Sequence, residues 1–180
     1  MIPLKHNLSV ICASVITLIS VVSLVPPTVN YVEFYRAFQK INLDISGFRF
    51  EFTDTYRGSI SMNFSITNPT DYKGISVISL VFKVLLVNNT KTYQLTDGKI
   101  RVWIKSDPGK PLEPKSAIHG SFNTILDLSY KKELADLIRE IYDNNGELTW
   151  CISNVSLDAR FFLGRFFIPL ENLTIKQYKL

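Results

Sequence analysis

A long stretch without charged residues near the N-terminus constrains this chain more than any other feature. No Asp, Glu, Lys or Arg occurs between Lys5 and Glu33, and residues 8–25 read LSVICASVITLISVVSLV. As a helix, these residues would span about 27 Å, close to the thickness of the hydrocarbon layer of a bilayer. We therefore expect a transmembrane helix over residues 8–25, which Pro26 and Pro27 would end near the membrane interface.

The same run has a second interpretation, a signal peptide that is cleaved. Signal peptides usually have a shorter apolar core and end in small residues at the cleavage site. Here residues 24–27 read LVPP, without an A-x-A-like step. The sequence thus favours a retained signal anchor, and secretion after cleavage is the alternative.

Two patterns predict the orientation of the chain. Lys5 directly precedes the apolar run, whereas Arg36 and Lys40 follow it at a distance, and this bias favours residues 1–7 in the cytoplasm. The remainder would then be extracytoplasmic. Four N-x-[ST] sequons, candidates for N-glycosylation, occur in that remainder, and a fifth at Asn7 would lie on the wrong side. The four are at Asn63, Asn88, Asn154 and Asn172.

The rest of the chain divides into a connector and one domain. In the connector, residues 26–43, aromatic residues recur at helical spacing from Tyr31 to Phe38, which predicts a short amphipathic helix. These aromatic residues could pack on a core or form an interfacial belt. Residues 44–180 have a normal single-domain size. With Cys12 in the apolar run and Cys151 alone in the domain, no disulfide inside the domain can stabilise it.

Alternation of apolar and polar residues predicts that the domain is mainly β. Short alternating segments separated by turn signals are typical of a sandwich or barrel. The predicted inward-facing positions are Phe48, Phe50, Phe52, Ile60, Met62, Phe64, Ile66, Ile78, Leu80, Phe82, Val84, Leu86, Ile100, Val102, Ile104, Ile118, Phe122, Leu126, Leu128, Leu148, Trp150 and Ile152.

One inserted segment, residues 131–144, has helical spacing instead. Apolar residues from Leu134 to Tyr142 recur every three or four positions. Ser129 is the predicted N-cap, and Asn145-Gly146 supplies a left-handed C-terminal stop. The predicted fold is therefore an immunoglobulin- or fibronectin-like antiparallel β-sandwich with one helix.

An aromatic segment near the C-terminus has two interpretations. Phe161, Phe162, Phe166 and Phe167 would place aromatic rings on both faces of one strand. The pattern favours a central strand buried on both sides, and the alternative is an exposed hydrophobic groove that forms an interaction surface. Two further strands are expected around it, over residues 148–153 and 173–178.

The order of these elements resembles the group 2 late embryogenesis abundant family, also called the water stress and hypersensitive response (WHy) domain. The resemblance covers residues 41–180, and its structural motif is the step Asn68-Pro69. The matching segments are residues 66–69 (ITNP), 74–77 (GISV), 114–116 (PKS), the helix, the strand 148–153 and residues 161–169 (FFLGRFFIP). Residues 87–90 (VNNT) replace the family's frequent glycine-rich hairpin. The resemblance implies a sandwich without a cofactor, linked to dehydration and stress protection and often tethered by one N-terminal helix.

Residues that could carry out catalysis are sparse. Of the two histidines, His6 adjoins the membrane run and His119 lies on a polar strand face. No His/Cys spacing typical of a metal site, phosphate loop or nucleophile elbow occurs, so we expect no cofactor, no metal and no small-molecule substrate. The net charge is +4 with dispersed Lys and Arg, which gives no support to nucleic-acid binding.

Three functional hypotheses follow. The leading one is a non-catalytic, membrane-tethered sandwich that protects or binds at the cell envelope, with membrane lipid around its helix and an envelope protein as partner. The second is a structural or adhesion subunit that docks through an edge strand or its aromatic strand. The third is an enzyme accessory domain or hydrolase, which requires a cleft where His119 meets an acid or a hydroxyl. An exposed aromatic patch or an open, uncharged strand edge would favour the second over a stand-alone protectant.

Overall fold

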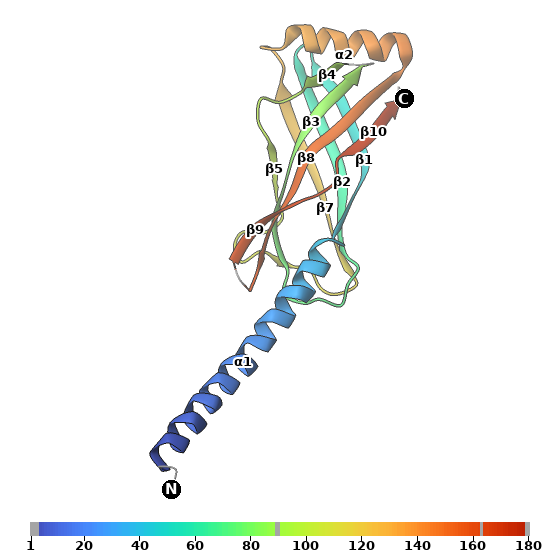
Figure 1. The fold of residues 1–180 in the computed structure, drawn as a ribbon. Coiled ribbons are helices and arrows are strands. Elements are labelled where there is room, and N and C mark those ends of the chain that lie inside the picture. The colour runs from blue at the N-terminus through green and yellow to red at the C-terminus, as the bar shows by residue number, and fades with distance from the viewer. Residues whose placement is uncertain (1–3, 89–90, 163, 179–180) are drawn as a thin grey trace. The chain divides into compact units, whose positions relative to one another are not determined.

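The computed structural model describes residues 4–88, 91–162 and 164–178. The chain forms two compact units, Met1–Lys40 and Ile41–Leu180, which we describe separately. The first unit is the helix α1 (Leu4–Phe38), and the second contains all strands and the helix α2 (Lys132–Asn145) (Figure 1).

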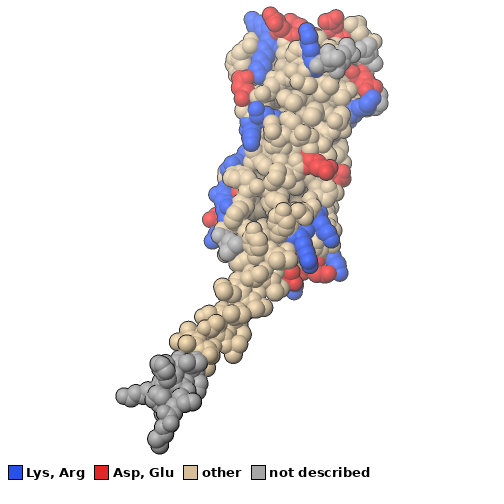
Figure 2. Space-filling view, viewed as in Figure 1, with Lys and Arg blue, Asp and Glu red and all other residues tan. Residues whose placement is uncertain are grey.

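Helix α1 is long and apolar enough to cross a membrane over Cys12–Phe38. No charged residue occurs between Lys5 and Glu33, and on the face that Figure 2 shows the described part of this stretch carries no charge. The hydroxyl groups of Thr17 and Ser20 donate hydrogen bonds of 2.8 Å to backbone carbonyls one turn earlier. These polar side chains are thereby satisfied within the helix, as a bilayer requires.

Helix α1 continues through Pro26 and Pro27, so the expected end of the helix at these residues is wrong. A proline lacks the amide hydrogen that would bond the carbonyl four residues earlier. Nearby hydroxyl groups add bonds on both sides of the prolines: Ser23 donates to the Ile19 carbonyl and Thr28 to the Leu24 carbonyl, each at 2.7 Å. Such bonds help membrane helices to tolerate interior prolines. The aromatic residues from Tyr31 to Phe38 are helical, but they belong to α1 rather than to a separate helix.

The second unit is an antiparallel β-sandwich, which confirms the predicted fold class. Its smaller sheet has the order β1-β2-β7; in the larger sheet the order is β10-β8-β3-β4, with β5 and β6 also on β3 and β9 on β8. The strands are β1 (Asn42–Asp54), β2 (Arg57–Asn68), β3 (Ser76–Asn88), β4 (Lys91–Gln94), β5 (Ile100–Trp103), β6 (Lys110–Pro111), β7 (Ser116–Asp127), β8 (Glu147–Phe161), β9 (Gly164–Pro169) and β10 (Leu173–Tyr178).

The core lies between the two sheets and contains most of the residues that the alternation places inward. The exceptions, which are half-buried, are Phe52, Ile100, Ile104, Phe122 and Leu126. Trp150 on β8 is fully buried, and its ring centroid lies 5.8 Å from that of Phe48 and 5.2 Å from that of Phe50 on β1. Phe82 on β3 meets Phe122 on β7 edge-on at 6.1 Å. Aromatic contacts of this geometry add to the stabilisation from buried apolar area, and they join the two sheets without a disulfide.

Helix α2 connects β7 to β8 and lies at one end of the sandwich, with β9 at the other end (Figure 1). Gly146 ends the helix in the left-handed region, at φ 66°, and its amide bonds the Tyr142 carbonyl, as the sequence predicted. The predicted N-cap is wrong: the cap position is Lys131, which makes no side-chain cap bond. Asp127 accounts for the difference, because its carboxylate accepts a 2.9 Å bond from the Ser129 amide and closes a turn before the helix begins.

Candidate functional site

The Asn68-Pro69 step holds the turn that leads from β2 toward β3. Asn68 is fully buried, and its side-chain amide donates a 2.9 Å bond to the Tyr72 carbonyl. Its side-chain oxygen accepts bonds from the amide and the hydroxyl of Thr70, at 3.1 and 2.7 Å. Both polar atoms of its side chain therefore serve the turn, and Pro69 follows where the strand leaves the sheet.

The aromatic segment near the C-terminus is a hairpin of two strands. β8 ends at Phe161 and β9 begins at Gly164, so the prediction of one central strand buried on both sides is wrong. Gly164 has a φ of 135°, which allows the chain to reverse direction there. Within the described part of the chain, β9 pairs with β8 alone and is an edge strand. The predicted segment includes Leu163, which lies outside the described residues.

The hairpin leaves three of its four phenylalanines exposed. Phe161 is 6% exposed, whereas Phe162, Phe166 and Phe167 are 47, 42 and 55% exposed. The ring of Phe161 packs on that of Phe166, with 4.5 Å between their centroids. Since large exposed aromatic groups are favourable contact points for a partner, the alternative interpretation of an interaction surface fits these three residues and excludes Phe161.

Strand register brings a second aromatic residue and three charged residues to the same outer surface. Asp158 on β8 lies opposite Ser79 on β3 and Phe167 on β9, and Ser79 lies opposite Trp103 on β5. Residues directly opposite each other in a sheet point to the same face. We call this surface the aromatic–arginine face and define it by Arg101, Trp103, Asp158, Arg165 and Phe167.

A buried carboxylate organises the aromatic–arginine face. Asp158 is fully buried and accepts two hydrogen bonds from Arg165, one of them from Nε at 2.7 Å, and one from the hydroxyl of Ser79 at 3.1 Å. The bonds from Arg165 lower the pKa of Asp158 below its ordinary value, although burial acts in the opposite direction, and Ser79 and Arg101 lower it further. The same pairing raises the pKa of Arg165. Asp158 is thus held as a carboxylate at neutral pH.

Arg101 occupies a different position from Arg165. Its Nη1 atom lies 3.8 Å from an Asp158 oxygen, while its guanidinium carbon lies 5.1 Å from the ring centroid of Trp103 and 6.0 Å from that of Phe167. Aromatic faces attract cations at these distances and restrict the side chain. Because Arg165 holds Asp158 by two bonds, Arg101 keeps donors free for another group.

A cleft of about 470 Å³ adjoins Arg101 on the same outer surface. It is lined by two cationic side chains, one hydroxyl group and three apolar groups. These are Lys99, Arg101, Ser156, Val81, Phe167 and Pro169. The lining combines positive charge with an apolar wall, a combination that suits a ligand with both characters.

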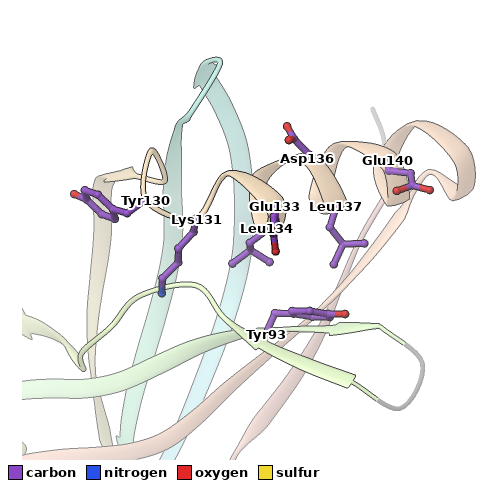
Figure 3. A pocket seen from close by; sticks show the side chains of 8 residues that line it. All are labelled: Tyr93, Tyr130, Lys131, Glu133, Leu134, Asp136, Leu137 and Glu140. Carbon is purple, nitrogen blue, oxygen red and sulfur yellow. The ribbon is translucent and has the colours of Figure 1, made fainter.

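A second hollow, of about 570 Å³, lies between α2 and β4 (Figure 3). Figure 3 shows Leu134 and Leu137 pointing from α2 toward the ring of Tyr93, while Glu133 and Glu140 stand along the helix. Lys131 closes one end, since its ammonium group pairs with Asp97 at 2.6 Å and bonds the Gln94 carbonyl. Glu133, Asp136 and Glu140 outnumber Lys131 in the lining, so this hollow is acidic, in contrast to the cleft at Arg101.

His119 lies on the outer face of the smaller sheet. It is opposite Ser65 on β2, which is in turn opposite Asp44 on β1. Asp44 and His119 are therefore two strands apart, about 9.6 Å at ordinary strand spacing. Within the described residues, no hydrogen bond joins His119 to either of them. Asp44, Ser65 and His119 nevertheless line one open hollow of about 590 Å³ on this face, so an acid and a hydroxyl do lie beside the histidine there. A base that activates a serine would also have to contact that serine.

The other predicted residues lie apart from the aromatic–arginine face. Among the sequon residues, Asn63, Asn154 and Asn172 are exposed and Asn88 is half-buried, while Asn89 and Thr90 lie outside the described residues. Asn172 is already engaged, because its side-chain oxygen accepts a 2.9 Å bond from the Asn154 amide. Over the described parts of the chain, no cluster of His, Cys, Asp or Glu could hold a metal ion.

The sequence reasoning missed Arg101, Trp103, Asp158 and Arg165. A signal was present: an aspartate within the apolar run of residues 155–159, VSLDA, needs a partner if it is buried. Placing the turn at Gly164 would have set Asp158 opposite Phe167, with Arg165 two residues before Phe167 and therefore on the same face. The assumption of a single strand over residues 160–169 hid this pairing.

Comparisons with known proteins show likeness of structure alone. No family model and no curated protein matches the chain. Similar solved structures include "a putative late embryogenesis abundant (LEA) protein", with 16% identity, a TM-score of 0.45 and coverage of 93% of this chain and 90% of that one. A protein from Arabidopsis thaliana has 16% identity and a TM-score of 0.46, and the match covers 76% of this chain and 80% of that one. A protein from Archaeoglobus fulgidus has 12% identity and a TM-score of 0.43, and the match covers 78% of this chain and 98% of that one. At these TM-scores the likeness defines no family, and the chain is classed here as an antiparallel β-sandwich with an N-terminal apolar helix.

Proposed function

We propose that this chain is a non-catalytic binding domain that α1 tethers to a membrane at the cell envelope. The resemblance noted in its sequence suggests a role in stress or dehydration protection. In the proposed arrangement, membrane lipid surrounds α1, the N-terminus is cytoplasmic, and the sandwich binds an envelope component through its aromatic–arginine face.

The observation that carries this proposal is the exposure of Trp103 and Phe167, at 60 and 55%, on either side of a fixed arginine. Covering an exposed Trp or Phe with a partner removes apolar surface from water, which favours binding. Trp and Arg are also common among the residues that dominate binding energy at interfaces. A stand-alone protectant would be expected to present a polar surface instead.

Site-specific photo-cross-linking tests the proposed surface. A photoreactive phenylalanine analogue would replace Phe167 in the full chain within native envelopes, and a matched control would replace Tyr130. Tyr130 is 73% exposed but lies beside α2, at the other end of the sandwich. We expect a discrete adduct from position 167 and none from position 130. Equal adducts from both positions, or none from 167, would contradict the proposal.

A structural or assembly subunit is the second candidate, and the open edge of β7 favours it. Among the residues that the structure describes, β7 pairs only with β2, and no charged residue or proline occurs from Ala117 to Leu126. Natural sheet edges are usually protected by charges, prolines or a covering segment. The opposite edge has such a cover, because the side chain of Gln177 bonds both the amide and the carbonyl of Phe50 on β1.

The same cross-linking experiment separates the two candidates. A photoreactive group at Ser121, an exposed residue on β7, reports on the open edge. Adducts from Ser121 without adducts from Phe167 would contradict binding at the aromatic–arginine face and support assembly through the β7 edge.

A further inference from the structure

We infer that the cleft beside Arg101 is a binding site for an oxyanion, a phosphate or carboxylate group, carried by a ligand with an apolar body. This inference rests on the proposed function and assigns a ligand class to one part of the aromatic–arginine face. Its elements are the two cations Lys99 and Arg101, the hydroxyl of Ser156 and the apolar wall formed by Phe167 and Pro169.

The charge balance of the site favours an anion. Lys99, Arg101 and Arg165 contribute three positive charges around the carboxylate of Asp158, and the neighbouring carboxylate of Asp107 is itself paired with Arg160 at 2.7 Å. Arg165 satisfies that carboxylate through both Nε and Nη2, and Arg101 contacts it only at 3.8 Å. No ion pair involves Lys99 within the described residues. The positive charge of the cleft is therefore left for a ligand to neutralise.

The position of Arg101 is fixed before any ligand binds. Its guanidinium lies between the rings of Trp103 and Phe167, with Asp158 beneath it. An arginine restricted in this way loses less side-chain entropy on binding. Its planar donors match the two oxygens of a carboxylate or phosphate group.

The apolar side of the cleft indicates which kind of group the rest of the ligand carries. Phe167 and Pro169 are exposed, and Val81 is buried beneath them on β3. The volume of about 470 Å³ lies within the range of pockets that hold small organic molecules, about 300–1,000 Å³. A ring or short aliphatic chain would cover the apolar wall while its anionic group meets Arg101. Glu133, Asp136 and Glu140 make the hollow beside α2 unsuitable for the same ligand.

Tryptophan fluorescence of the full chain in a non-ionic detergent provides the test. Trp103 lies 5.1 Å from the Arg101 guanidinium and is exposed, whereas Trp150 is fully buried, so a ligand in the cleft should change the Trp103 signal. The probes are phenyl phosphate and benzoate. The control probes are phenol, which has the ring without the anionic group, and inorganic phosphate, which has the anion without the ring. We expect saturable binding of phenyl phosphate, benzoate or both, at least several-fold tighter than binding of phenol or inorganic phosphate.

Variants connect the binding to the cleft. Arg101→Gln should weaken the binding about tenfold or more, and Lys99→Gln should weaken it a few-fold, because both remove a cation from the lining. Arg49→Gln is the matched control, because Arg49 is an exposed arginine on the smaller sheet. It should leave binding unchanged. Near-ultraviolet circular dichroism would establish that each variant is folded, and Lys99→Gln provides a second test if Arg101→Gln is not.

Three results would overturn the inference: no saturable binding of either anionic probe, equal binding to Lys99→Gln and the unaltered chain, or equal losses in Arg49→Gln and Arg101→Gln. Adducts from position 167 in envelopes together with no binding of the anionic probes would leave the proposed binding face in place and reject only the oxyanion site. If position 167 gave no adducts and the anionic probes did not bind, both the proposed binding face and the oxyanion site would be rejected.

Discussion

At the scale of single residues, Asp158 is the group on which the aromatic–arginine face depends. Replacing it with asparagine removes the charge that two arginines approach and leaves the bonds to Arg165 weaker. We expect Asp158→Asn to lower the free energy of unfolding by about 1–3 kcal/mol, the usual effect of losing hydrogen bonds to a charged group. Urea titration measures this change. Asp71→Asn is the control, since its pair with Lys115 is fully on the surface, and it should leave stability nearly unchanged.

The lowered pKa of Asp158 predicts a pH dependence. A carboxyl whose pKa is lower in the folded than in the unfolded chain stabilises the fold above its unfolded pKa, near 3.8, and loses this effect as the pH falls through its folded pKa. The free energy of unfolding should therefore decrease below about pH 4. The decrease should be smaller in Asp158→Asn. Parallel curves for the two proteins between pH 5 and pH 2 would show that Asp158 does not contribute.

Local alternation predicted most buried residues well, because side-chain direction in a strand follows sequence position. Ile60, Met62, Phe64 and Ile66 are all buried as expected. Asp158 was missed because its burial depends on Arg165 and Ser79, which only the hairpin and the pairing of β3 with β8 bring beside it. Alternation within one strand contains no information on such partners.

At the scale of elements, the two edges of the smaller sheet differ in protection. Gln177 on β10 covers the β1 edge through two bonds to Phe50 and also accepts a 3.1 Å bond from the indole of Trp150. We expect Gln177→Ala to lower the free energy of unfolding by about 1–3 kcal/mol, because it leaves buried polar groups without partners. Asn123→Ala on the open β7 edge is the matched control and should stay within about 0.5 kcal/mol. Equal effects in thermal unfolding would contradict this difference between the edges.

Element boundaries were predicted where one residue determines them and missed where several compete. Gly146 ends α2 because its left-handed conformation is favourable for glycine. Ser129 was a plausible cap, but Asp127 engages its amide first. The β8–β9 turn was missed because Phe161 and Phe162 continue a strand-like composition up to the reversal at Gly164.

At the scale of the whole molecule, the sequence separates an apolar helix from a β-rich domain, and the structure has these two units. The hydrophobic pattern of the sequence is sufficient for this division, because a helix that spans a bilayer needs a long run without charged residues and the strands of a sandwich alternate apolar and polar residues. The length of the helix was underestimated, since Pro26 and Pro27 do not end α1.

Orientation is a further prediction at this scale. Cys151 is a poor reporter, because partial burial raises the pKa of its thiol and slows labelling. Thr92→Cys, at an exposed position on β4, is a better one in a chain whose own cysteines are changed to serine. A membrane-impermeant thiol reagent should label it on intact cells. Labelling only after the membrane is broken would reverse the predicted orientation.

Extraction of membranes with alkaline carbonate tests the membrane tether most directly, because it releases peripheral proteins and leaves spanning ones in the bilayer. We expect the full-length chain to stay in the membrane pellet. The double variant Ile16→Lys and Ile19→Lys should be released, since each central lysine costs about 2.5–3.5 kcal/mol of insertion free energy. Release of the unaltered chain at full length, or of a shorter chain that has lost its N-terminal residues, would contradict the tethered account.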